Sequence, residues 1–154
     1  MKERIAILLG FMNDQRNILF RIFDQLINME PLDENKTIHC AYLLHNLYNA
    51  YEDLFKEISV SFENNIEQSA GFHKNILLRM KHTIPGIRPR VISDDSFVLL
   101  SELLAFRHVF RHAYNYNLDA HKIQELRKKL TQKNNRVQKD LDGFESFLKD
   151  VLDT

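Results

Sequence analysis

The chain has 154 residues, of which 44% are hydrophobic and 27% charged, and its lysines and arginines balance its acids at a formal net charge of +0. This length and composition are typical of one globular domain with a hydrophobic core, and they exclude an intrinsically disordered chain. Because the net charge is zero, binding to nucleic acid would need a local basic patch rather than a field around the whole protein.

Apolar residues recur at spacings of three and four along most of the chain, which is the period of amphipathic α-helices. Pro31, the Pro85-Gly86 pair and Pro89 interrupt this pattern, and Ser93 is predicted to cap a helix whose first turn carries acids. Few alternating β-branched runs remain for strands. The pattern therefore predicts that residues 1–154 form a single domain, an all-α, antiparallel up-and-down helical bundle. Its helices are expected over about residues 2–29, 34–67, 71–82, 94–116 and 120–152.

The single cysteine, Cys40, excludes an internal disulfide and lies in an apolar stretch. It is expected to be a small core residue, because no sequence feature supports a nucleophilic role. No apolar run approaches the roughly 20 residues of a membrane-spanning helix. The start of the chain is interpreted as the first turns of a helix and not as a signal peptide, because Glu3 interrupts its basic end. We therefore expect a cytoplasmic protein without a membrane partner.

Two stretches are basic although the chain as a whole is neutral. Residues 68–93 contain no acid, and residues 122–139 contain seven lysines or arginines against the single Glu125. One hypothesis is a phosphate-binding strip beside the helix expected over 94–116, and the alternative is a solvated helix face. Charge counting does not separate the two. In the first stretch the candidate phosphate-binding residues are Arg79, Lys81, Arg88 and Arg90.

The most informative segment is residues 107–114, with the sequence RHVFRHAY. Two arginines, two histidines and a tyrosine lie within about two helical turns, although charge that is buried without partners destabilises a fold. Arg107 falls on the apolar stripe of its helix, about 20° from Tyr114. Arg107 therefore either pairs with a buried acid or lines a polar cleft. An arginine can stabilise charge on a phosphate, and a histidine can transfer protons near neutral pH.

His108 and His112 lie one turn apart and share a side of the helix, whereas His112 lies about 140° around the helix from Arg107. A histidine pair at this spacing can bind zinc. Here no glutamate base is adjacent, and Arg111 places a cation beside the proposed ligand. We therefore predict neither a metal nor another cofactor.

The order Arg107, four residues, His112, one residue, Tyr114 resembles the R-x4-H motif and its H-x-Y extension in the HEPN superfamily. Within that superfamily the chain resembles the HepT-like toxins of bacterial toxin–antitoxin pairs, which are small helical bundles of about this length with the motif on a late helix. The resemblance covers the whole chain in architecture and is specific over about residues 97–119.

The resemblance implies a metal-independent ribonuclease that acts as a homodimer, with the motif helices of two copies meeting at the two-fold axis. Arg107 and His112 are the implied catalytic residues. His112 would act as general base or acid around the 2′-hydroxyl and the leaving oxygen, and Arg107 would hold the scissile phosphate. The product would end in a cyclic phosphate, transfer RNA is a substrate compatible with the family, and the basic residues between 79 and 90 would bind RNA.

Tyr114 matches the tyrosine that a nucleotidyltransferase antitoxin of the MNT type modifies with AMP in HepT pairs. A bound nucleotide would add bulk and negative charge where RNA phosphates must enter; the alternative is a core tyrosine. One departure is His108, because the residue after the motif arginine is commonly Asn or Asp. We assign His108 a supporting role. Arg111 is not a motif residue and is either an auxiliary phosphate contact or a surface arginine.

Two other functions remain open. The first is a non-catalytic HEPN module that binds nucleotide or serves as a scaffold for the transferase. It would share the bundle and the dimer, but the purified chain would not cleave RNA. The second is a helical adaptor in which Arg107 and His112 neutralise buried acids.

Overall fold

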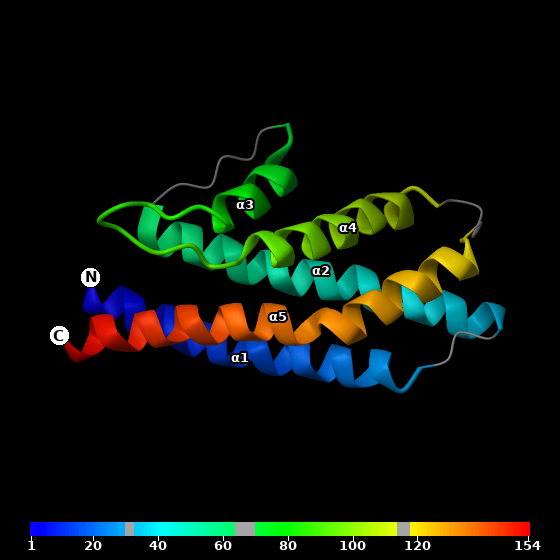
Figure 1. Cartoon of the computed structure of the whole chain (residues 1–154), viewed down its shortest axis with the longest axis horizontal. Coiled ribbons are helices and arrows are strands. Elements are labelled where there is room, and N and C mark those ends of the chain that lie inside the picture. Colours follow the sequence, from blue (N-terminus) through cyan, green and yellow to red (C-terminus); the bar gives the residue numbers. More distant parts are fainter. Residues whose placement is uncertain (30–32, 64–69, 114–117) are drawn as a thin grey trace.

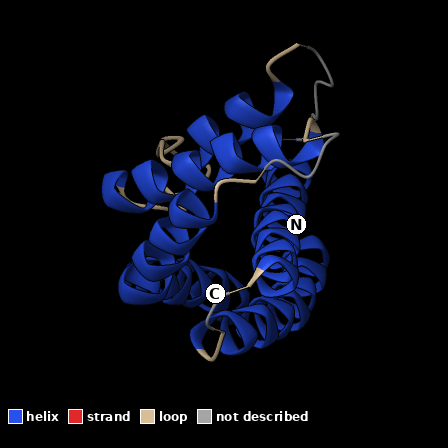
Figure 2. Cartoon of the chain, turned by 90° about the vertical axis from the view of Figure 1, so that its right-hand side faces the viewer, coloured by secondary structure: helices blue, strands red, loops and turns tan. Residues whose placement is uncertain are grey.

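The computed structural model describes residues 1–29, 33–63, 70–113 and 118–154. Within these ranges the secondary structure consists of α-helices without strands, as predicted. Figure 1 shows the long helices running alternately in opposite directions, with a short helix, α3, on one side. Viewed from the side in Figure 2, every described segment is a helix or a loop. The helices are α1 (Lys2–Ile27), α2 (Glu34–Glu63), α3 (Phe72–Met80), α4 (Asp94–Arg111) and α5 (Ala120–Asp153).

The central helix of the bundle is α2, which packs against each of the other four helices. Its side chains Tyr48, Tyr51 and Phe55 are fully buried. Burying a large apolar side chain of this kind stabilises a fold by about 1.5–3 kcal/mol. Cys40 is also fully buried on α2, and burial raises the pKa of its thiol to about 11. The thiol is therefore protonated at neutral pH, and the prediction that Cys40 packs in the core is confirmed.

The start of α4 is fixed to α5 by a network of hydrogen bonds around one carboxylate. Ser93 is the predicted N-cap, and its hydroxyl accepts a hydrogen bond from the Ser96 backbone N–H. Asp140 on α5 accepts hydrogen bonds from the Ser93 backbone at 2.9 Å, the Ser93 hydroxyl at 2.8 Å and the Ser96 hydroxyl at 2.5 Å. An N-cap contributes about 1 kcal/mol by satisfying N–H groups that the helix leaves unpaired. This network sets where α4 lies on the bundle.

The end of α4 differs from the prediction. The helix was expected to continue to about residue 116, but it ends at Arg111, and His112 is its C-cap with φ −107° and ψ 10°. The last backbone bonds join residues three apart, from His112 N–H to Val109 O at 3.2 Å and from Ala113 N–H to Phe110 O at 3.2 Å. This tightening satisfies carbonyl groups at a helix terminus. The motif histidine therefore lies at the end of the helix and not within it.

Among the described helices, none is both long enough and apolar enough to cross a membrane.

Candidate functional site

The guanidinium of Arg107 lies against α2. Its Nε donates a hydrogen bond of 2.7 Å to Oδ1 of Asn49, and both side chains are half-buried. Within the described ranges, no carboxylate pairs with Arg107, and its two terminal nitrogens have no hydrogen-bond partner. An amide is uncharged, so the positive charge of the guanidinium is not neutralised by this contact. Of the two interpretations of Arg107, the pairing with a buried acid is therefore not what the described residues show, because the partner of Arg107 is an amide of α2.

The imidazole of His45, which is also on α2, lies beside Asn49. The Asn49 amide nitrogen lies 3.5 Å from Nδ1 of His45, and the His45 ring lies 5.0 Å from the Phe110 ring, centroid to centroid. Burial lowers the pKa of His45, and the nearby Arg107 and Arg111 lower it further, against a hydrogen bond with Asn46 that raises it. The uncharged form of His45 is therefore favoured beside the two guanidinium groups.

Asn49 and His45 were not identified from the sequence. The available signal was the polar pair itself, which is spaced four residues apart on a helix whose neighbouring positions Leu44 and Tyr48 are fully buried. Residues four apart share a face of a helix. A polar pair within a packing face requires partners on another helix, but the pattern alone does not identify those partners.

The motif histidine, His112, and its neighbour His108 lie on the outer side of α4. His108 and His112 are both exposed, and their ring centroids are 4.6 Å apart in an edge-to-face arrangement, so the prediction that they share a side is confirmed. Arg107, by contrast, contacts α2. One protomer therefore directs its motif arginine and its motif histidine to different sides. Among the described residues, no group of three or more His, Cys, Asp or Glu side chains is placed to hold a metal ion.

The outer face of α4 also carries exposed apolar residues. Val98 is 57% exposed and Val109 is 60% exposed, and the exposed Ala105 lies between them. Together with His112, these residues follow spacings of seven, four and three, which place them along one line of the helix. We call this set, Val98, Ala105, Val109 and His112, the outer α4 stripe. It has the spacing by which one helix packs on another.

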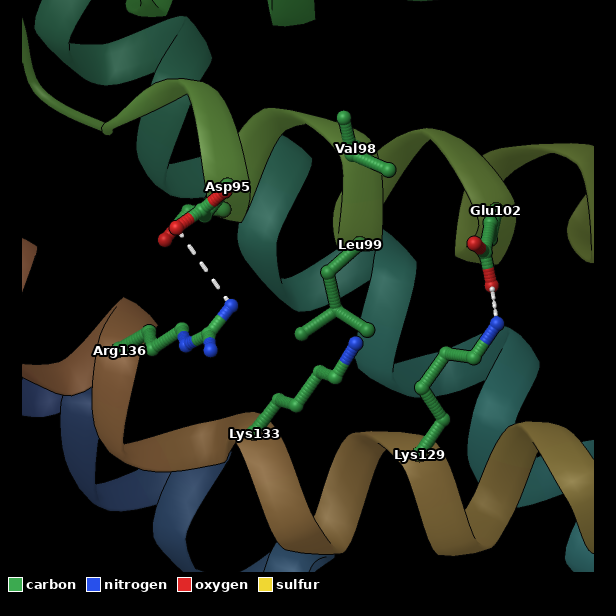
Figure 3. A pocket seen from close by; sticks show the side chains of 8 residues that line it. Asp95, Val98, Leu99, Glu102, Lys129, Lys133 and Arg136 are labelled. Atoms are coloured by element: carbon green, nitrogen blue, oxygen red, sulfur yellow. Dashed lines mark hydrogen bonds and ion pairs between the residues drawn. The ribbon is translucent and has the colours of Figure 1, made fainter.

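A charged groove between α4 and α5 borders this stripe (Figure 3). Lys129 of α5 binds Glu102 of α4 at 2.9 Å, and Arg136 pairs with Asp95 at 3.5 Å. Lys133 lies between these two pairs and extends toward Leu99 (Figure 3). No acid among the described residues forms an ion pair with Lys133. The groove therefore holds one positive charge that is not paired within it.

Not all of the predicted phosphate-binding residues of the 79–90 stretch lie at the surface. Arg88 must be removed from this set, because its guanidinium is fully buried and donates hydrogen bonds to Glu63 at 3.2 Å and to three backbone carbonyls. Arg79 pairs with Glu63 at 3.3 Å, and Lys81 lies 4.6 Å from the centre of the Phe97 ring. Arg90 is exposed.

Lys81 lies far from Arg107. It lies 4.0 Å from Asp94, in the first turn of α4, whereas Arg107 lies in the second half of that helix. Arg107 lies thirteen positions after Asp94, which corresponds to about 20 Å along the helix axis. Tyr114, the predicted modification site, lies outside the described residues.

Comparison with known protein families gives a match. The sequence profile of a family described as "HepT-like protein" matches residues 39–148, which include most of α2, the motif and most of α5. No curated protein and no solved structure matches the chain.

Proposed function

Since the chain belongs to the HepT-like family of the HEPN superfamily, we propose that it is the toxin of a HEPN/MNT toxin–antitoxin pair, a ribonuclease that acts in the cytoplasm without a metal. Arg107 binds the scissile phosphate through its terminal nitrogens and stabilises the negative charge that builds on it. His112 removes the proton from the 2′-hydroxyl or supplies a proton to the leaving 5′-oxygen, and water carries the other of these two protons. The 2′-oxygen forms a bond to phosphorus as the bond to the 5′-oxygen breaks. The products are a cyclic phosphate end and a 5′-hydroxyl end.

The observation that carries this proposal is the contact of Arg107. Asn49 holds the guanidinium through Nε alone, without an acid among the described residues. A purely structural arginine on a packing face needs a carboxylate to balance its charge. This arginine has its charge and two terminal nitrogens available for an anion. The adaptor alternative gives no reason for that arrangement.

We propose that the protein acts as a homodimer through the outer α4 stripe. Val98 and Val109 are exposed apolar residues that lie along one line of α4 with the small Ala105 between them, an arrangement that suits packing against a second helix. Pairing two copies of this stripe brings His112 of each protomer to the two-fold axis. Arg107 and His112 face different sides of one helix, and we propose that the catalytic pair is assembled from residues of two protomers.

The groove between α4 and α5 supports a path for RNA beside that axis. Lys133 supplies one unpaired charge next to the outer α4 stripe, and such charges bind nucleic-acid backbones without reading sequence. We retain as proposed contacts, for parts of the RNA farther from the cleavage site, Arg79, Lys81 and Arg90. His108 and Arg111 are proposed to support the site, since His108 contacts the His112 ring and Arg111 lies one residue before it.

The direct test is cleavage of RNA by the purified chain in the presence of EDTA. We expect cleavage that EDTA does not reduce, with fragments that end in a cyclic phosphate, because no step of the mechanism uses a metal. The measurement is gel analysis of end-labelled transfer RNA and of a mixed RNA pool, followed by mass spectrometry of the ends. A folded dimer that cleaves neither RNA would support the non-catalytic scaffold, and cleavage abolished by EDTA would support the metal-binding histidine pair.

Tyr114 is proposed as the point of control. Incubation with a nucleotidyltransferase of the MNT type and ATP is expected to add AMP mass at Tyr114 and to stop cleavage, because the added phosphate repels RNA. Tyr114→Phe is expected to cleave RNA and to escape this inhibition. Tyr116→Phe is a matched control, since it removes a phenol two residues away and should stay sensitive. Peptide mapping that places the AMP on Tyr116, or on no tyrosine, would refute the assignment.

A further inference from the structure

We propose that Asn49 is a positioning residue that holds Arg107 through an uncharged group, so that the guanidinium keeps its full charge for the scissile phosphate. This inference rests on the proposed ribonuclease function. The 2.7 Å bond reaches Nε, the one guanidinium nitrogen on the side-chain stem, and so fixes the orientation of the planar group. Both terminal nitrogens are left in a geometry that can bind two phosphate oxygens at once.

Whether position 49 offers an amide or a carboxylate to Arg107 decides whether the guanidinium can bind a phosphate. A carboxylate at position 49 would accept the same hydrogen bond and bind the guanidinium more strongly. It would also cancel the charge and repel an incoming phosphate. Fold stability alone therefore favours aspartate at this position, whereas phosphate binding requires the amide. The presence of Asn49 is the reason to assign it a role in function rather than only in packing.

The titratable groups around Asn49 also leave the charge of Arg107 available for a phosphate. On the His45 side, the neighbouring imidazole is kept uncharged by burial and by the two arginines. On the other side, Glu52 lies three residues along α2 and is 2% exposed, and its carboxylate contacts Nδ1 of His73 on α3 at 2.5 Å. The buried acid nearest in sequence is therefore engaged by a different helix. Its partner is His73 and not Arg107.

The test compares three substitutions at one position. Asn49→Asp is expected to fold, to keep the oligomeric state of the wild type and to lose about 10²-fold in kcat/KM, comparable to removing one oxyanion donor. Asn49→Ala is expected to lose about ten-fold, because Arg107 keeps its charge but is less firmly oriented. Asn49→Gln, which retains an amide, should be the least affected of the three. Asn35→Asp adds the same charge at the exposed start of α2 and should cleave like the wild type.

The order of activities separates the two possible roles of Asn49. A positioning role through an uncharged group predicts that the alanine variant is more active than the aspartate variant. A structural role predicts the reverse, because aspartate restores the hydrogen bond that alanine removes. Aspartate activity equal to or above that of alanine would overturn the inference. Failure of Asn49→Asp to fold would also overturn it, since a carboxylate beside Arg107 should form a stable pair.

A second measurement separates this inference from the proposed function. Affinity for a 2′-deoxy oligonucleotide, which cannot be cleaved, is read by fluorescence anisotropy. We expect Asn49→Asp to bind it at least ten-fold more weakly than the wild type, because about 1.4 kcal/mol of phosphate binding is lost. If the wild type cleaves no RNA but this difference is found, the proposed function fails and the role of Asn49 stands. If the wild type cleaves RNA and the aspartate variant binds and cleaves like it, only the inference fails.

Discussion

His112→Ala and Arg107→Ala each abolish RNA cleavage and growth inhibition on the proposed mechanism, while the protein stays folded and dimeric. Loss of a general acid or base lowers a rate by roughly 10²–10⁴-fold. Loss of the group that stabilises charge on the phosphate costs roughly 10²–10³-fold. Neither change removes a core contact, since His112 is exposed and Arg107 is half-buried. Single-turnover cleavage of labelled RNA, with circular dichroism and light scattering on the same samples, measures both effects.

Controls with other imidazoles make this result specific. His121→Ala removes an exposed histidine that lies 3.0 Å from Glu125 at the start of α5, and it should cleave like the wild type. His108→Ala removes the ring that contacts His112 and should cause a smaller loss than His112→Ala. Full toxicity in both Arg107→Ala and His112→Ala would remove the catalytic assignment.

Mixing the two inactive proteins should restore cleavage if the catalytic pair forms across the two-fold axis. In a mixed dimer, one site receives Arg107 from the His112→Ala subunit and His112 from the Arg107→Ala subunit, while the second site lacks both groups. Random exchange makes half of the dimers mixed, so about a quarter of the wild-type activity should return. The measurement is cleavage after the two variants have been unfolded and refolded together. A catalytic pair formed within one protomer would give no recovery.

The contact surface can be tested in the same experiment. Val109→Glu places a charge in the outer α4 stripe, and it should yield monomers that show no recovery on mixing, because an unpaired charge in an interface is costly. Phe20→Glu is the matched control, since Phe20 is 70% exposed on α1. It should dimerise and exchange normally. Dimers of Val109→Glu that recover activity would place the interface elsewhere on the molecule.

Much of the fold could be predicted from the sequence, because helix formation depends largely on residues that are close together in the chain. The spacing of apolar residues predicted the five helices, and Ser93 was recognisable as an N-cap from its hydroxyl and the acids that follow it. The end of α4 was misjudged, because helix ends depend on which backbone groups find partners in the last turn. The hydrogen bonds from His112 and Ala113 to residues three earlier decide that end, and no spacing rule anticipates them.

The sequence by itself determined the family and its motif, because Arg107, His112 and Tyr114 lie close together in the chain and their spacing is readable without a structure. Only the tertiary structure decided which helix meets Arg107 and with what charge. Asn49 lies 58 positions away from Arg107, so their contact exists only once α2 and α4 have packed. Arg88 is the opposite case. Its charge suggested a phosphate contact, but in the folded protein its side chain is buried and pairs with Glu63. Periodicity reports which faces are buried, but the pairing of polar groups on different helices depends on how those faces are placed together.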